Sequence, residues 1–264
     1  MIDASLPAGR FSDGEFRIGR VFSRTWSVFS SHFLTFVLVT GIANLPSLFI
    51  PRPAPGAPMP LSPFQLVGVT FAALVLLMVL WVLSQAVLLY AAFQAMQGRP
   101  IDLAESARIG LRRFFPIIGV VLSVGLLVGL ASLLLVVPGI MLYIAWSVAT
   151  PVCVVERLGP FSSMGRSREL TRGHRWKIFG MWLLILLVAV IVGGILGGLA
   201  FAILGANGIL ALSAAMSTLV GQIVNLVWSS IWTAFFSILI VVTYHDLRVA
   251  KEGIDTDQIA AVFD

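Results

Sequence analysis

Charged residues are scarce in this chain, since Asp, Glu, Lys and Arg make up only 11% of its 264 residues. Ordinary soluble domains contain about a quarter. Cys153 is the only cysteine, so no intrachain disulfide can stabilise a small secreted domain. Hydrophobic residues make up 59%, and the mean hydropathy is +1.01. These figures exclude a soluble α/β enzyme and a disordered tail, and they predict an integral membrane protein.

Ionisable side chains are also rare within the apolar stretches, where only His32, Cys153, Tyr90 and Tyr143 occur, apart from Lys177 and Tyr244 at the ends of two stretches. Coupled carriers and intramembrane proteases place a charged group at depth because that group does their work. The three histidines are scattered, and we find no nucleophile beside a base and no phosphate-binding glycine loop. The sequence therefore predicts a non-enzymatic protein with no catalytic residue, no metal, no cofactor and no nucleic-acid partner.

Six apolar stretches are long enough to cross about 30 Å of hydrocarbon at roughly 1.5 Å per residue. They cover residues 31–50, 65–96, 116–137, 139–155, 177–205 and 209–244. The second and the sixth are longer than a perpendicular span needs, so we expect them to tilt or to extend beyond the bilayer. The fourth is short, starts at Pro138-Gly139 and contains Pro151, so a kinked or partly re-entrant segment is the alternative to a full crossing.

The positive charges predict the orientation of these spans. All but one of the 17 lysines and arginines fall on one side of the predicted membrane, and the exception is Arg52. Because basic loops resist translocation, we expect both termini in the cytoplasm and a multi-pass protein of the bacterial inner membrane. The first thirty residues have no compact apolar core typical of a signal peptide. The predicted outer connections are a Pro-rich loop at 51–63, a tight turn at 136–139 and a link at 205–208.

An arginine pair spaced four residues apart precedes the first, third and fifth spans: Arg20 and Arg24, Arg108 and Arg112, Arg168 and Arg172. Asp102 and Glu105 predict a helix start before the second pair. We therefore expect an all-α membrane protein with six transmembrane helices in three hairpins, each preceded by a short amphipathic interfacial helix. Its expected parts are a cytoplasmic N-terminal segment with such a helix (1–30), hairpin 1 (31–96), a helix and hairpin 2 (99–155), a helix and hairpin 3 (157–246), and a cytoplasmic tail (247–264).

The basic residues of these amphipathic stretches have two interpretations. As topological signals they hold the loops on one side and anchor the helices at the headgroups. As a binding surface they hold anionic lipid or an acidic partner, at roughly 1 kcal/mol for each basic residue near the membrane. The candidate binding residues are Arg20, Arg24, Arg108, Arg112, Arg166, Arg168 and Arg172.

Two patterns within the spans suggest helix contacts. The fifth span has four closely spaced glycines, which allow the backbone of another helix to approach: Gly193, Gly194, Gly197 and Gly198. We expect them to pack against a neighbouring span of the same chain, and a homodimer contact is the alternative. The sixth span has polar side chains on one face: Gln222, Asn225, Ser229, Thr233 and Ser237. Hydrogen bonds between helices explain this stripe, with Asn44, Gln85 and Gln94 as expected partners; a hydrated path is the alternative.

Two stretches resemble a known family. The first runs from Pro138-Gly139-Ile140 through Trp146, Pro151, Val154-Val155-Glu156 and the segment 166–173 to Trp176, and the second is the segment 244–255 with Asp246. They resemble the bacterial membrane domain found beside some glycerophosphodiester phosphodiesterases and, more distantly, the YciC-like inner-membrane proteins. The resemblance implies a six-span helical domain of poorly characterised role. It implies no phosphodiesterase activity, because those enzymes use a separate soluble barrel that this chain has no room for.

The sequence leaves two functions in competition. The first is an inner-membrane protein that binds or organises lipid, expected to be anionic, or a membrane protein partner, through a basic cytoplasmic face. The second is an uncoupled transporter or lipid translocator that uses the polar stripe. We also expect Asp246, where the last span leaves the hydrocarbon, to pair with Arg166, Arg168 or Arg172 and fix the tail against the bundle.

Overall fold

The computed structural model describes residues 16–49, 62–205 and 208–252, which are helical almost throughout and contain no strand. The helices are α1 (Ile18–Ser31), α2 (Phe33–Asn44), the 3-10 helix η1 (Leu45–Phe49), α3 (Pro63–Met96), α4 (Leu103–Leu134), α5 (Val136–Ala145), α6 (Ala149–Val155), α7 (Pro160–Thr171), α8 (Arg175–Leu204), α9 (Gly208–Ser217) and α10 (Leu219–Glu252). The predicted all-α class is therefore confirmed.

Five helical segments are long and apolar enough to cross a membrane, so the chain is a multi-pass membrane protein. They are Phe64–Met96, Leu103–Leu134, Val136–Val155, Arg175–Ile203 and Leu219–Glu252. A sixth is reached only if the consecutive helices at Ile18–Ser31 and Phe33–Leu48, which are bent by 83° at His32, count as one span. The stretch predicted as the first span is thus short, and it meets the preceding amphipathic helix at a sharp bend.

The second amphipathic stretch does not form a helix of its own. Asp102 caps α4 by accepting hydrogen bonds from the amides of Ala104 and Glu105, as expected, and the helix then continues without a break to Leu134. Pro116 lies inside it. The separate helix expected before the third span is therefore wrong, because α4 runs through Gly110, Pro116 and Gly119 as one helix.

The connection after α4 is a single extended residue, Leu135, rather than a turn at 136–139. Pro138 falls in the first turn of α5, where the missing amide is tolerated. Gly139 lies against α4 so closely that a Cβ there would collide with the side chain of Ser132. Glycine at this position allows the close return of α5 along α4.

Two of the predicted spans are broken in the structure. Residues 146–148 separate α5 from α6, which agrees with the kinked form of the fourth span. Residue 218 separates α9 from α10, so the stretch 209–244 is not one helix. At its other end α10 continues to Glu252, so the first residues of the predicted tail, 247–252, are helical; the rest of that tail lies outside the described residues.

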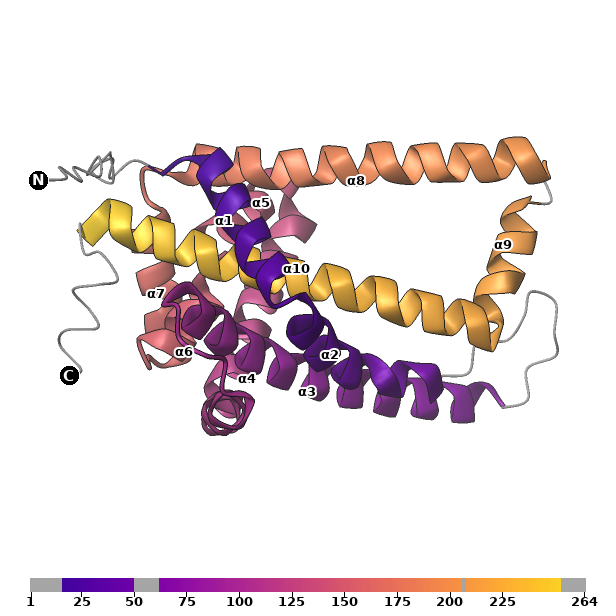
Figure 1. The fold of residues 1–264 in the computed structure, drawn as a ribbon, viewed down its shortest axis with the longest axis horizontal. Coiled ribbons are helices and arrows are strands. Elements are labelled where there is room, and N and C mark those ends of the chain that lie inside the picture. The colour runs from indigo at the N-terminus through magenta and orange to yellow at the C-terminus, as the bar shows by residue number, and fades with distance from the viewer. Residues whose placement is uncertain (1–15, 50–61, 206–207, 253–264) are drawn as a thin grey trace, which may run out of the picture.

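The helix α1 begins beside the start of α8 and lies across the C-terminal half of α10 (Figure 1). Its buried face includes Val21, Val28 and Phe29, which belong to the hydrophobic core. Just before α1, Phe16 is fully buried and its carbonyl accepts a hydrogen bond of 3.2 Å from Lys177 Nζ on α8. The amphipathic pattern of α1 therefore serves packing within the chain on one side.

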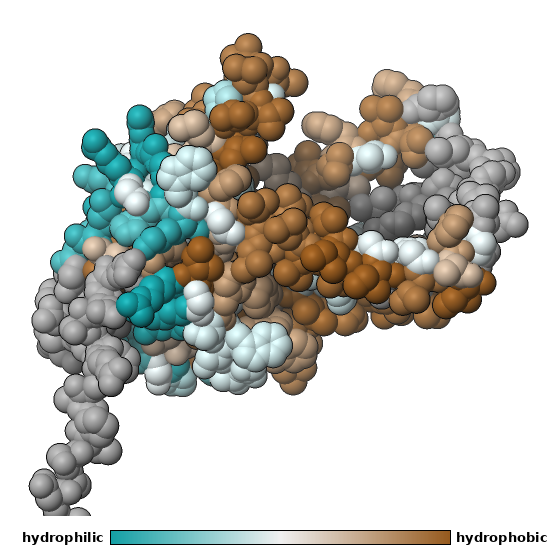
Figure 2. Space-filling model, turned by 90° about the horizontal axis from the view of Figure 1, so that it is seen from above, coloured by the Kyte–Doolittle hydropathy of each residue, from teal (hydrophilic) through white to brown (hydrophobic). Residues whose placement is uncertain are grey.

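Hydrophilic side chains gather at one end of the molecule, and hydrophobic side chains cover most of the remaining visible surface (Figure 2). This is the end where α7, the start of α8 and the end of α10 lie (Figure 1). The far part of α8 is exposed, and no residue of its most apolar stretch is buried against the rest of the chain. Such a surface suits lipid, because apolar side chains facing hydrocarbon have no free energy to gain from burial against protein.

Candidate functional site

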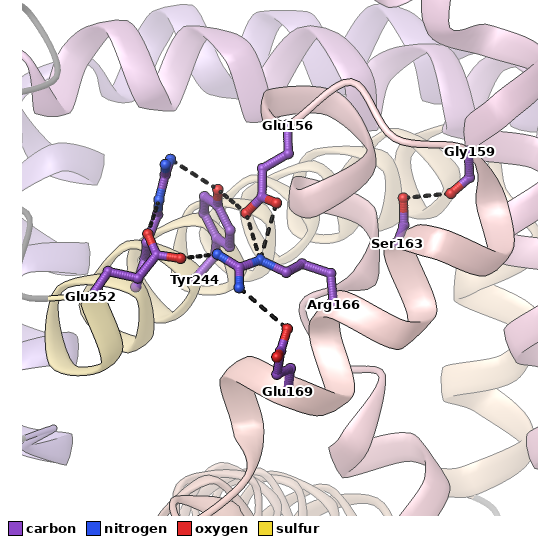
Figure 3. Close-up of polar contacts among 8 residues, drawn as sticks. Glu156, Gly159, Ser163, Arg166, Glu169, Tyr244 and Glu252 are labelled. Carbon is purple, nitrogen blue, oxygen red and sulfur yellow. Dashed lines mark hydrogen bonds and ion pairs between the residues drawn. The ribbon is translucent and has the colours of Figure 1, made fainter.

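The guanidinium of Arg166 on α7 lies at the centre of an ion-pair cluster at the polar end (Figure 3). Its Nε donates to Glu156 Oε2 at 3.1 Å, and its Nη1 donates to Glu169 Oε2 at 3.3 Å. Its Nη2 donates to Glu252 Oε1. Only 26% of the Arg166 side chain is exposed, and its charge is paired with three carboxylates of the same chain.

Two further side chains of α10 extend the cluster (Figure 3). The hydroxyl of Tyr244 donates to Glu156 Oε1 at 3.0 Å, and Arg248 Nε donates to Glu252 Oε2 at 2.9 Å. Tyr244, Arg248 and Glu252 are spaced four residues apart, so one face of α10 presents all three. The cluster joins the end of α6, the middle of α7 and the last turns of α10.

Asp246 forms a second, more deeply buried ion-pair group. Its side chain is 2% exposed, with Oδ1 3.0 Å from Arg24 Nη1 and Oδ2 3.5 Å from Arg20 Nε. The ring of His245 lies 3.4 Å from the same carboxylate. The predicted pairing of Asp246 with the third basic segment is therefore wrong, because α1 lies along α10 and brings the first arginine pair to this carboxylate.

The remaining four candidate arginines are exposed. Arg108 and Arg112 lie on the first turns of α4, Arg168 lies on α7, and Arg172 directly follows α7. In the part of the chain that the structure describes, none of these four side chains forms an ion pair or a hydrogen bond. The seven arginines that the sequence grouped together thus separate into three that neutralise carboxylates and four that face outward.

A polar cavity of about 780 Å³ lies beside the ion-pair cluster, and sequence reasoning missed it. Inside it, Glu105 accepts hydrogen bonds from the Tyr90 hydroxyl at 2.9 Å and from Gln94 Nε2 at 3.1 Å. Arg99 and Arg157 are exposed at its wall and have no carboxylate partner within the described ranges. Gln94 was expected to face the sixth span, but its position near the start of α4 directs it to Glu105 instead.

The polar stripe on α10 contributes to helix packing at one end. Ser237 Oγ donates to Gln85 Oε1 on α3 at 2.8 Å, which confirms Gln85 as a partner. Toward the other end, the side-chain amide of Gln222 donates to the carbonyl of Ser217. The hydroxyl of Ser229 donates to the carbonyl of Leu226, and Asn225 is exposed.

Asn44 and Thr233, the other two residues of this prediction, form no hydrogen bond to another helix among the described residues. The Asn44 amide donates to the carbonyl of Thr40 in its own helix, and the carbonyl of Thr233 accepts a hydrogen bond from Ser237 on the same helix. These are contacts within helices, so the translocation path stays a prediction without a supporting contact.

The glycines of α8 do not pack against another span of this chain. Gly193, Gly194, Gly197 and Gly198 are exposed, and a Cβ placed on any of them meets nothing within 4 Å. The expected contact within the chain is therefore not found among the described residues. Within the same residues, no group of three or more His, Cys, Asp or Glu side chains could hold a metal ion.

Comparison with known proteins gives one match. Residues 63–247 match the family model described as a domain of unknown function, DUF7847. No curated protein matches the chain, and no solved structure does. The match covers more than half of the chain and includes the ion-pair cluster and the polar cavity except for Arg248 and Glu252, which follow its last residue.

Proposed function

Since the chain belongs to the DUF7847 family, whose description carries no activity, we propose a function from its own geometry: it binds and organises anionic lipid at the cytoplasmic face of a bacterial inner membrane. In this proposal it is not an enzyme, and its working surface is the set of exposed arginines at the polar end.

One observation carries the proposal. Arg108, Arg112, Arg168 and Arg172 are exposed and make no ion pair within the described residues, although several carboxylates lie at the same end of the molecule. Those carboxylates are taken up by Arg20, Arg24, Arg166 and Arg248. The four exposed guanidiniums keep their donors for a ligand from outside, and planar guanidinium donors match the oxygen atoms of a phosphate.

The proposal includes an orientation. The polar end faces the cytoplasm with both termini, and the helices form three hairpins that cross the membrane six times, with α1 followed by α2 as the bent first unit. In this orientation α1, the start of α4 and α7 lie at the headgroups of the inner leaflet. The distribution of lysine and arginine along the sequence supports it, because all but Arg52 fall on one side of the predicted spans.

Replacing all four arginines by glutamine, as R108Q/R112Q/R168Q/R172Q, tests the proposal. Because each basic residue near the membrane contributes roughly 1 kcal/mol, we expect binding to phosphatidylglycerol vesicles to weaken by at least about tenfold. Native mass spectrometry should also detect less co-purified anionic lipid. The matched control replaces the same four residues by lysine, which keeps the charge and should keep most of the binding.

The thermal unfolding midpoint of both variants in detergent shows whether they are folded. A folded glutamine variant that retains the wild-type content of anionic lipid would exclude this function. A polar end that binds an acidic protein instead would show the opposite pattern, with unchanged lipid content and loss of a protein from the purified complex.

A further inference from the structure

An apolar groove of about 610 Å³ lies between α5 and the first turns of α8. Its walls include Ile140 and Met141 of α5 and Phe179 of α8, and Arg175 and Trp176 also line it. The volume falls within the range of about 300–1,000 Å³ that is usual for small-molecule sites. The groove is separate from the ion-pair cluster and shares no residue with the four exposed arginines.

Arg175 is the polar group of this groove. Its Nε atom is buried and has no hydrogen-bond partner within the described residues. By contrast Lys177, two residues later, is bound to the carbonyl of Phe16. A buried guanidinium N–H without an acceptor costs free energy. Because Arg175 also lines the groove, its positive charge is open to an acceptor that enters the groove from outside the chain.

The surroundings of Arg175 favour a negatively charged acceptor. Arg175 is the first residue of α8, and the N-cap residue His174 forms no capping hydrogen bond with its side chain. The positive end of a helix of thirty residues therefore adds to the guanidinium charge. The side chain of Trp176 is 84% exposed beside it, a position that suits the boundary between headgroups and hydrocarbon.

The groove lies along the segments Val136–Val155 and Arg175–Ile203, both of which are apolar enough to cross a membrane. Its occupant is therefore drawn from the bilayer. We propose that the groove holds an acyl chain of an anionic phospholipid, with the lipid phosphate accepting hydrogen bonds from Arg175. This inference extends the proposed function to one specific lipid site, and it depends on different residues.

The test uses the full chain with two kinds of substitution. Arg175→Gln removes the charge and preserves the length of the side chain, whereas Met141→Trp fills the groove. Met141 is 55% exposed, so a larger side chain fits there without disturbing the core. Ile140→Phe is a second groove-filling variant in case Met141→Trp does not fold. Lys251→Gln is the matched control, because Lys251 is an exposed cation at the end of α10 that does not line the groove.

Purified protein is titrated with phosphatidylglycerol and, separately, with phosphatidylcholine, and the tightest bound lipid is counted by native mass spectrometry. We expect wild type and Lys251→Gln to prefer phosphatidylglycerol at one site. Arg175→Gln should lose this preference, with affinity for phosphatidylglycerol reduced about tenfold or more. Met141→Trp should lose that site for both lipids, because the acyl chain of the lipid no longer fits in the groove.

Wild-type affinity for phosphatidylglycerol in both Arg175→Gln and Met141→Trp would overturn the inference. If these two variants behave as wild type while the variant with four glutamines loses anionic lipid, the groove site is wrong and the proposed function stands. If instead only the groove variants lose lipid, the site is right and the basic face is not the binding surface.

Discussion

Arginines that look equivalent along the sequence have different environments in the structure. Arg166 and Arg168 are two residues apart on α7, so they point to nearly opposite faces of the helix. Arg166 faces α6 and α10 and meets three carboxylates, while Arg168 is exposed. The role of each arginine is thus set by the helix face it occupies.

Replacing Arg166 by glutamine should destabilise the protein. The change leaves Glu156 and Glu252 near each other without their shared cation, and these side chains are only 16% and 22% exposed. For a partly buried cluster we expect a loss of about 1–3 kcal/mol in the free energy of unfolding. Denaturation in detergent micelles measures it.

Arg168→Gln is the control on the same helix and should change the unfolding free energy by less than about 0.5 kcal/mol. Equal stability of the two variants and the wild type would show that the Arg166 cluster does not hold the polar end together.

Among the helices, α1 shows how one element can serve two surfaces. Thr25 and Phe29 are buried toward the core, whereas Trp26 is 63% exposed on another face. The same helix supplies Arg20 and Arg24 to the buried carboxylate of Asp246. The ion pairs fix the helix against α10, and the exposed face is left for the membrane surface.

Asp246→Asn should loosen α1. Without the carboxylate, Arg20 and Arg24 lose their buried partner, so amide hydrogen exchange across 18–31 should become faster. In a double-mutant cycle with Arg24→Gln, the combined loss should be smaller than the sum of the single losses by about 0.5–3 kcal/mol.

The control for this cycle is Asp102→Asn, which changes an acidic residue on another helix where asparagine is also a good N-cap. Exchange in α1 should stay as in the wild type. If Asp246→Asn and Asp102→Asn give the same exchange in 18–31, the Asp246 ion pairs do not hold α1.

At the scale of the whole molecule, hydrophilic and hydrophobic side chains are segregated along the long axis (Figure 2). The α7 region lies at one end of that axis, and the corner between α9 and α10 lies at the other (Figure 1). In the proposed orientation the two ends face opposite sides of the membrane, with the basic end inside.

Cysteine labelling in intact cells checks this orientation. Ser162 on α7 and Thr218 between α9 and α10 are both exposed, whereas the native Cys153 is fully buried and gives little background. We expect Thr218→Cys to react with a membrane-impermeant maleimide from outside, and Ser162→Cys to react only after permeabilisation. Reaction of Ser162→Cys in intact cells would reverse the orientation and remove the basic face from the cytoplasm.

The sequence by itself determined the helical class, the position of most apolar segments and the concentration of arginine at one end. These properties are local, because a helix and its affinity for hydrocarbon depend on residues within a few turns. For this reason α3 and α8 nearly coincide with the stretches 65–96 and 177–205.

Only the tertiary structure decided which charges neutralise one another and where cavities form. Arg24 and Asp246 are separated by 222 positions, and Arg166 and Glu252 by 86, so no spacing rule connects them. The groove at Arg175 likewise forms only because α5 lies against the start of α8, and the sequence does not predict that the Nε atom of Arg175 is buried there without a partner among the described residues. Pairing and burial depend on which helix faces meet, and several packings of the same helices satisfy the same hydropathy.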